Sequence, residues 1–201
     1  MAEKKPFAVA EPMLGHDVEP VDAAEPNDDG DLTGLRLRNA RWAGRLIEDA
    51  RVADVDFDEC DLAGLQTDDG SFRRVVFRGC RLSGSMLAGA KVTDVRFVGC
   101  KLDDANFRMA KLERVEFVDC VLIAADFYAA SMSSVRFQDS DLRGVDVTKA
   151  VLNDVDLRTS RLEDIKGADA LRGVTIDESQ VISLARSLAF ALEMRIVDAD
   201  S

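Results

Sequence analysis

The chain has 201 residues, of which 47% are hydrophobic, and it carries a formal net charge of −12 at pH 7. That acidity argues against direct binding to nucleic acid, whose phosphate groups are recognised by Lys and Arg. No apolar run approaches the roughly 20 residues that a membrane span requires, and residues 1–20 lack the pattern of a secretory signal, so we expect a soluble cytoplasmic protein.

Residues 1–30 hold all four prolines of the chain, together with many acids and few large apolar groups. This composition is typical of a disordered region, so residues 1–30 are predicted to be an acidic, proline-containing tail. As an alternative, Phe7, Val9, Met13 and Leu14 could fold back over the start of the domain that follows and cover its open edge.

Residues 31–172 repeat with a period of twenty residues and, within it, a finer period of five. Nearly every position whose number ends in 2 or 7 is a large apolar residue, and the position two before it is small or apolar, except at Arg45. The clearest columns are Val55, Val75, Val95, Val115, Val135 and Val155; Phe57, Phe77, Phe97, Phe117, Phe137 and Leu157; and Cys60, Cys80, Cys100, Cys120, Ser140 and Ser160.

A period of five matches neither a helix nor a strand, so it indicates a chain that turns a corner every five residues. Four corners make one coil of twenty residues, and about seven coils fit between residues 32 and 172. Stacking at about 4.8 Å then turns each column into an interior ladder of like side chains. Arg45 is expected to turn outward or to pair with Glu48 or Asp49.

The four cysteines fall on one interior column, where stacked side chains point the same way. Neither a disulfide nor a metal site suits that arrangement, so we expect buried free thiols that pack as small hydrophobic residues. Acids that precede a central Leu or Phe, such as Asp61, Asp126, Asp141 and Asp146, are expected at solvated corners with their side chains bonded to turn amides.

The five-residue units resemble those of the pentapeptide-repeat proteins, as in Cys60-Asp61-Leu62-Ala63-Gly64 and Ala105-Asn106-Phe107-Arg108-Met109. The resemblance implies an all-β solenoid, a right-handed quadrilateral parallel β-helix, over residues 31–172. The best understood family members, which confer quinolone resistance or self-protection, are dimers that imitate duplex DNA and occupy the DNA-binding saddle of DNA gyrase. The resemblance therefore implies a protein partner, with gyrase as the named candidate.

Residues 173–201 are predicted to contain a helix that begins near Asp177 and runs to about Met194, with Asp177 and Gln180 in a capping box. Its apolar residues cover more than one stripe, so one face is expected to seal the last coil and the rest to meet a second copy across a two-fold axis. The alternative is a cap with some apolar residues exposed. The residues assigned to this cap and dimer contact are Val181, Leu184, Ala185, Leu188, Phe190 and Leu192.

The sequence offers few groups for catalysis. Its one histidine, His16, lies in the predicted tail, and it has no phosphate loop, metal-ligand motif or nucleophile elbow. We expect a protein that is not an enzyme and that needs no cofactor or metal.

One segment is more acidic than the rest of the repeat region. Residues 46–70 contain nine acids against Arg51 alone, a local net charge of −8. This acidic patch could receive a basic protein surface or a divalent cation; alternatively, it only keeps one end of the rod soluble. Its members are Glu48, Asp49, Asp54, Asp56, Asp58, Glu59, Asp61, Asp68 and Asp69.

Two functions are compatible with these features. The chain modulates or protects DNA gyrase as a DNA mimic, or it is a rigid scaffold for another cytoplasmic protein. Residues 31–172 carry 22 bases and 25 acids, a net charge of only −3, which departs from a phosphate mimic. A basic ladder on one face is part of that departure and consists of Arg51, Arg73, Arg74, Lys91, Lys111 and Arg114.

Overall fold

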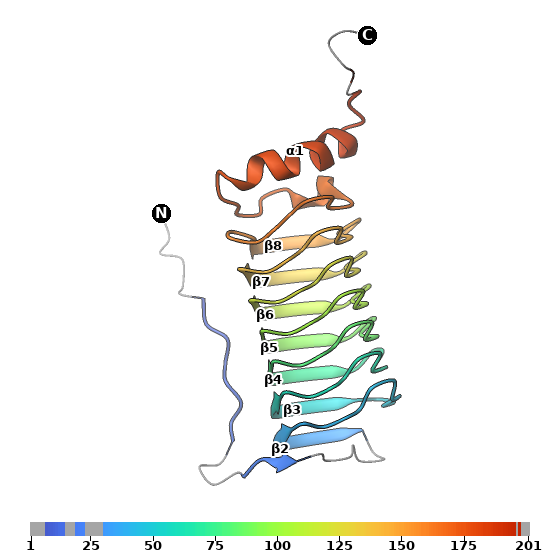
Figure 1. Cartoon of the computed structure of the whole chain (residues 1–201), viewed down its shortest axis with the longest axis vertical. Helices are drawn as coiled ribbons and strands as arrows, with labels where there is room; N and C mark the ends of the chain where they lie inside the picture. Colours follow the sequence, from blue (N-terminus) through green and yellow to red (C-terminus); the bar gives the residue numbers. More distant parts are fainter. Residues whose placement is uncertain (1–6, 15–18, 23–29, 196, 198–201) are drawn as a thin grey trace.

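A computed structural model of the chain describes residues 7–14, 19–22, 30–195 and 197. These residues form a four-sided solenoid of stacked parallel coils with one helix, α1, across its C-terminal end (Figure 1). One parallel sheet contains every described strand in sequence order. The strands are β1 (Val21–Asp22), β2 (Asp31–Arg38), β3 (Arg51–Asp58), β4 (Ser71–Arg78), β5 (Lys91–Val98), β6 (Lys111–Val118), β7 (Ser131–Gln138) and β8 (Val151–Asp156).

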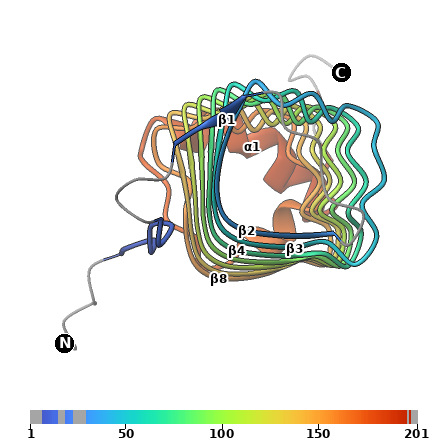
Figure 2. The ribbon, with the colours of Figure 1, turned by 90° about the horizontal axis from the view of Figure 1, so that it is seen from below.

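The register confirms the predicted period. From β2 onward each strand pairs with the next at a step of twenty residues, so that Val55 lies beside Val75 and Phe77 beside Phe97. Isolated bridges such as Leu46 to Gln66 carry the same step around the remaining sides. Viewed along its axis, the chain traces a four-sided tube (Figure 2).

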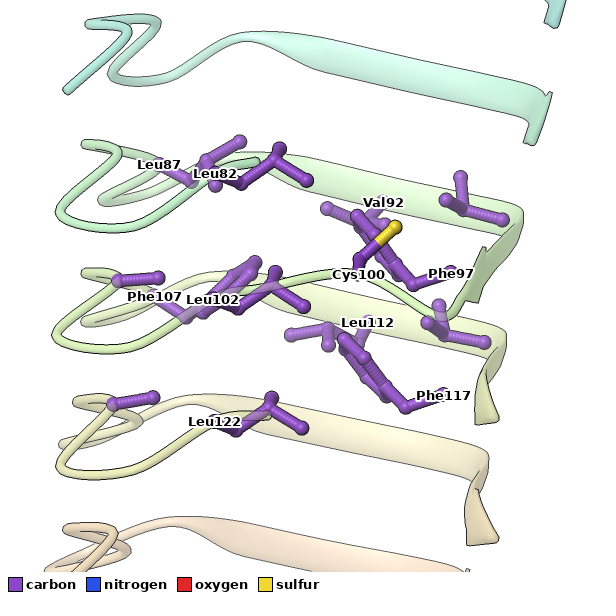
Figure 3. Close-up of a cluster of buried hydrophobic side chains, with 14 of the residues drawn as sticks. Leu82, Leu87, Val92, Phe97, Cys100, Leu102, Phe107, Leu112, Phe117 and Leu122 are labelled. Atoms are coloured by element: carbon purple, nitrogen blue, oxygen red, sulfur yellow. The ribbon is translucent and has the colours of Figure 1, made fainter. Parts of the chain in front are cut away.

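The predicted inward columns fill this tube. Phe77, Phe97 and Phe117 are at most 3% exposed. Their rings stack almost parallel, with centroids 4.8 to 4.9 Å apart. Figure 3 shows the rings of Phe97 and Phe117, the neighbouring leucines and the Cys100 thiol turned into the same interior. Because one coil step equals a stacking distance, each ring packs against the same ring in the next coil.

The corners depend on a backbone feature that was not predicted from the sequence. Every residue from Gly34 to Asp164 whose number ends in 4 or 9 has a positive φ, between 51° and 69°. Only glycine adopts this region without strain, and Asn and Asp tolerate it better than most residues. The many Gly and Asp residues in these columns fit that requirement, although Met109, Ala124 and Lys149 also occupy it.

The aspartates before each central residue bond turn amides as predicted. Asp126 and Asp146 each accept a hydrogen bond at 2.8 Å from the amide two residues ahead. Asp61 and Asp141 make the same contact at 3.3 Å. Arg45 is exposed, so it turns outward.

The last coil is incomplete. β8 has six residues, two fewer than each of β2 to β7, and a 3-10 helix, η1 (Ala168–Leu171), replaces the final corner. The structure therefore has about six complete turns, slightly fewer than the seven predicted. The helical turn forms where the repeat fails, at Gly167 and Arg172.

α1 spans Gln180–Ala191, so it ends before the predicted Met194. Glu193 has a positive φ, and the Met194 amide donates to the Ala189 carbonyl at 2.8 Å, which closes the helix in a Schellman motif. At the other end the capping box is present. The Gln180 amide donates to Asp177 Oδ1 at 3.2 Å, and the Asp177 amide donates to Gln180 Oε1 at 2.9 Å.

The N-terminal segment differs from the expected disordered tail where the structure describes it. Residues 7–14 lie along the outside of the solenoid beside the strands (Figure 1), and β1 pairs with the end of β2. Residues 7–14 do not cover the first edge as the alternative proposed, because Met13, Ala10 and Phe7 contact Asp54, Asp94 and Arg136 on the side of later coils. Residues 1–6, 15–18 and 23–29 of the predicted tail lie outside the described residues.

Candidate functional site

The predicted acidic patch lies on the coils of β3 and its neighbours, and its nine acids divide into two groups. Four are paired with arginines one coil away or on the adjoining strand. These pairs are Asp54 with Arg74, Asp56 with Arg36 and Arg78, Asp58 with Arg38, and Asp61 with Arg81. The coil body has a net charge close to zero, and its opposite charges meet along the same columns.

Asp54 shows this pairing most clearly. Its carboxylate accepts two hydrogen bonds from Arg74, at 2.6 Å from Nε and 2.5 Å from Nη2. The Arg74 hydrogen bonds hold the pKa of Asp54 below its ordinary value. The arrangement recurs two coils further on, where Arg114 donates to Asp94 at 2.7 Å from Nε and 2.9 Å from Nη2. These hydrogen bonds lower the pKa of Asp94. Arg74 and Arg114 of the predicted basic ladder are thus neutralised where they stand.

Asp56 is perturbed in the opposite direction. Burial raises its pKa, although Arg78 and Arg36 lie 3.4 and 3.8 Å away. Its Oδ1 is buried with no hydrogen-bond partner among the described groups. Asp56 therefore belongs to the packed wall of the solenoid and is poorly placed to meet a partner.

The remaining five acids, Glu48, Asp49, Glu59, Asp68 and Asp69, are exposed, and none forms an ion pair with a described residue. Four of them occupy two neighbouring columns on two successive coils. We call Glu48, Asp49, Asp68 and Asp69 the acidic quartet. Like charges one coil apart repel, so this group gains stability from salt or from a basic partner.

A basic and aromatic group follows in the same two columns, beyond the uncharged Ala88 and Gly89. The Arg108 guanidinium lies 4.2 Å from the centre of the Tyr128 ring, and Lys149 Nζ lies 2.7 Å from the Tyr128 hydroxyl. These two columns thus change from acidic to basic residues along their length, and Arg108 also forms an ion pair with Asp126 at 2.9 Å. This change was not predicted from the sequence, although reading the columns of residues 48 and 49 upward would have found it.

The six residues predicted to form the cap and the dimer contact divide on α1 into one buried residue and five that are not buried. Leu184 is 2% exposed and packs against the core, and it alone of the six is buried. The helix therefore seals the last coil with a narrow face and leaves a wide apolar face in solvent. That face contains Val181, Ala185, Leu188, Phe190 and Leu192 of the predicted set, together with Ile182, which is 85% exposed.

The cysteine column consists of free, buried thiols, as predicted. Each Sγ donates to a main-chain carbonyl of the preceding coil, as Cys100 does to Phe77 at 3.4 Å. The hydrogen bond with the neighbouring thiol, together with burial, raises the pKa of Cys80 and of Cys100 to about 12. Thiols in this state are poor nucleophiles and poor metal ligands.

Within the described part of the chain, no group of three or more His, Cys, Asp and Glu side chains is arranged to hold a metal ion. Two voids inside the tube measure about 20 Å³ each and have apolar linings, which is close to the size of one water. His16 lies outside the described residues. None of the described helices has the length and apolar character needed to cross a membrane.

Comparisons with known proteins agree with this architecture. The family model described as "Pentapeptide repeat region" matches residues 50–118 and 90–167. No curated protein sequence matches the chain. A trypsin-treated variant of QnrB1, described as a plasmid-mediated fluoroquinolone resistance protein, superposes with a TM-score of 0.53 at 22% identity, covering 83% of each chain. A second such variant gives a TM-score of 0.50 at 19% identity and covers 89% of this chain and 90% of that one.

Proposed function

Because the chain belongs to the pentapeptide repeat family, we propose that it is a non-enzymatic, protein-binding rod that acts through the outward columns of its solenoid. The interior is filled by stacked side chains, with voids of only about 20 Å³, so a substrate would find no cleft there. The outer walls are regular and rigid, and they are the surfaces available to a partner. We place this activity in the cytoplasm and expect no direct contact with nucleic acid or membrane.

The observation that carries the proposal is the acidic quartet. Asp54, Asp56, Asp58 and Asp61 are held by arginines, whereas the quartet acids are exposed and lie one coil above another, so that their like charges repel. A basic protein surface would relieve this repulsion and gain electrostatic complementarity on binding. The basic group around Tyr128 on the same face would fix the direction in which that partner lies.

DNA gyrase is the first specific partner to test. The likeness to QnrB1 supports a shared fold, and that protein is described as a fluoroquinolone resistance protein. A DNA mimic presents negative charge along its length, and here the Asp54–Arg74 and Asp94–Arg114 pairs interrupt it. We therefore propose that any gyrase contact is centred on the acidic quartet and does not run the length of the rod.

The exposed face of α1 supports a homodimer. Ile182 and Phe190 are each 85% exposed, and Leu192 is 66% exposed, on the end of the molecule that the helix seals. Two helices packed across a two-fold axis would bury these groups and place the two acidic quartets at opposite ends of a longer rod. Light scattering at micromolar concentration tests this, and a monomer would contradict it.

The gyrase proposal is tested by supercoiling assays with the purified chain, with and without a quinolone. We expect altered supercoiling or reduced quinolone inhibition, and a weaker effect for the Asp68→Lys/Asp69→Lys variant. Supercoiling that stays unchanged under both conditions would contradict the gyrase assignment.

A rigid scaffold for another cytoplasmic protein is the second candidate. It is favoured by the mixed charge of the coil body, in which acids and arginines alternate along columns such as Asp54, Arg74, Asp94 and Arg114. Capture of one stoichiometric partner other than gyrase by the immobilised chain would support it.

A further inference from the structure

Residues 7–14, which we call the N-terminal strap, lie along one corner of the solenoid and run against the direction of stacking (Figure 1). The Met13 amide donates to Asp54 at 2.9 Å, and the Ala10 amide donates to Asp94 at 3.4 Å. The strap therefore crosses successive coils and uses main-chain donors to bond outward carboxylates.

The spacing of these bonds matches the spacing of the coils. Asp54 and Asp94 are two coils apart, which is about 9.6 Å at the strand-pairing distance. Three residues of extended chain, from Ala10 to Met13, span about 10 Å. One further step of three residues leads to Phe7, whose ring lies 3.9 Å from the Arg136 guanidinium, two residues beyond Ser134 in the same series.

Side chains add to this main-chain match. Glu11 forms an ion pair with Arg96 at 2.6 Å, and Arg96 is held from its other side by Glu116 at 2.8 Å. Val9 is 9% exposed, so it is buried although it belongs to no coil. Pro12 has no amide hydrogen, and it stands between the two residues whose amides are used.

The carboxylates that receive the strap are fixed by the solenoid itself. Arg74 and Arg114 each grip their aspartate through two hydrogen bonds, and Oδ1 of each aspartate also accepts from the strap. The same pairing lowers the pKa of both aspartates, which are ionised at neutral pH. The acceptors thus exist whether or not the strap is present, and any extended chain with suitable donors can meet them.

We propose that this corner is a binding track for an extended peptide of a partner protein, and that residues 7–14 occupy it in the free chain as a built-in competitor. The peptide that fits has an aromatic residue first, amide donors at the fourth and seventh positions, and an acid at the fifth to meet Arg96. Recognition follows the mode in which main-chain hydrogen bonds give affinity and a few side chains give specificity. This inference rests on the proposed protein-binding function for the existence of a partner and adds the chemistry of that partner.

The test uses the full-length chain and a labelled synthetic peptide with the sequence of residues 7–14. In one chain the strap is weakened by Phe7→Ser and Glu11→Lys, and in a second by Ala10→Pro, which removes the donor to Asp94. Circular dichroism checks that both variants keep the solenoid, which we expect because the changes lie outside the coils. We expect the peptide to bind each variant at least tenfold more tightly than the wild type, whose track is occupied.

A charge exchange provides the control. Arg96→Glu added to the Ala10→Pro chain, which keeps Glu11, should abolish binding of the peptide, and a peptide with Glu11→Lys should restore it. Equal binding to the wild type and the variants, or no binding to the variants, would overturn the inference. A stoichiometric protein partner captured by a chain that does not bind the peptide would overturn the track alone and leave the protein-binding function standing.

Discussion

Gln180 Nε2 donates a hydrogen bond of 2.7 Å to the main-chain carbonyl of Leu157, twenty-three residues earlier in the chain. Hydrogen bonds over the same separation of 23 residues join the Cys100 thiol to the Phe77 carbonyl and the Ser160 hydroxyl to the Phe137 carbonyl. Gln180 thus continues the cysteine and serine column from the first turn of a helix. The hydrogen bond that recurs from coil to coil therefore also connects α1 to the last coil.

Replacing Gln180 with Met should loosen this cap. Met has a similar shape but cannot donate to Leu157 or Ser160 or accept from the Asp177 amide. Two buried carbonyls and that amide lose a partner, at a cost of at least about 2 kcal/mol. Urea denaturation measures the free energy of unfolding of the wild type and of the variant. The control, Glu178→Ala on the exposed side of the same turn, should change it by less than about 0.5 kcal/mol. Equal effects of the two substitutions would contradict the role given to Gln180.

The thiols should be inert in the folded protein. All four cysteines are at most 2% exposed, and the pKa of Cys80 and of Cys100 is raised to about 12. The hydrogen bond with Cys100 lowers the pKa of Cys120, so that thiol is protected by burial alone. Because the thiolate is the reactive form, a disulfide reagent at about pH 8 should label none of them before unfolding and all of them in denaturant. Rapid labelling of the native chain would show that the column is open.

Asp54 and Asp56, two residues apart, should respond in opposite ways to loss of charge. Asp54→Asn removes the negative charge and one of the two oxygens that accept from Arg74, so it should lower the melting temperature by several degrees. Asp56→Asn relieves a buried charge and should leave the melting temperature unchanged or raise it. Thermal melts at neutral pH compare the two.

The pH dependence provides a second check on Asp54. Its folded pKa lies below the ordinary value of 3.8, so its contribution is present above that value and is lost as the pH falls through the folded pKa. The Asp54→Asn chain should therefore lose less stability than the wild type below about pH 4. Parallel acid titrations would contradict the pairing.

Met109 should reveal the strain at the corners. It has a φ of 57° and is 60% exposed, so its side chain contributes little packing. Met109→Asn should stabilise the chain and Met109→Ile should destabilise it, with a difference of about 1 kcal/mol, because β-branched residues fit this backbone region poorly. Lys111→Ile, at an exposed strand position, is the control and should have little effect. Similar stabilities for the Asn and Ile variants at position 109 would argue against strained corners.

The interior of the rod follows from the sequence because one physical rule repeats. An apolar residue every five positions has a single consistent placement, and the Phe and Cys columns lie where that rule puts them. The capping box of Asp177 and Gln180 was also readable, since its two bonds depend on residues three apart. The positive φ at the corners could have been found from the Gly and Asp residues in those columns.

The outer surface was harder to predict, because it depends on pairs between coils. Asp54 was assigned to the acidic patch and Arg74 to a basic ladder. Residues twenty apart in sequence lie on adjacent coils, so these two side chains form an ion pair. The strap shows the same limit more strongly. Nothing local in residues 7–14 indicates that Glu11 meets Arg96, since that contact requires the finished stack.

We propose that the outward charges of this rigid rod bind a protein partner. The direct measurement is capture of a partner by the immobilised full-length chain, by its Asp68→Lys/Asp69→Lys variant and by an Asp119→Lys/Asp139→Lys control with the same change of charge on another exposed column. We predict one stoichiometric partner that is lost with the first variant and retained with the control. The same capture by all three chains, or no stoichiometric partner for the wild type, would contradict the claim.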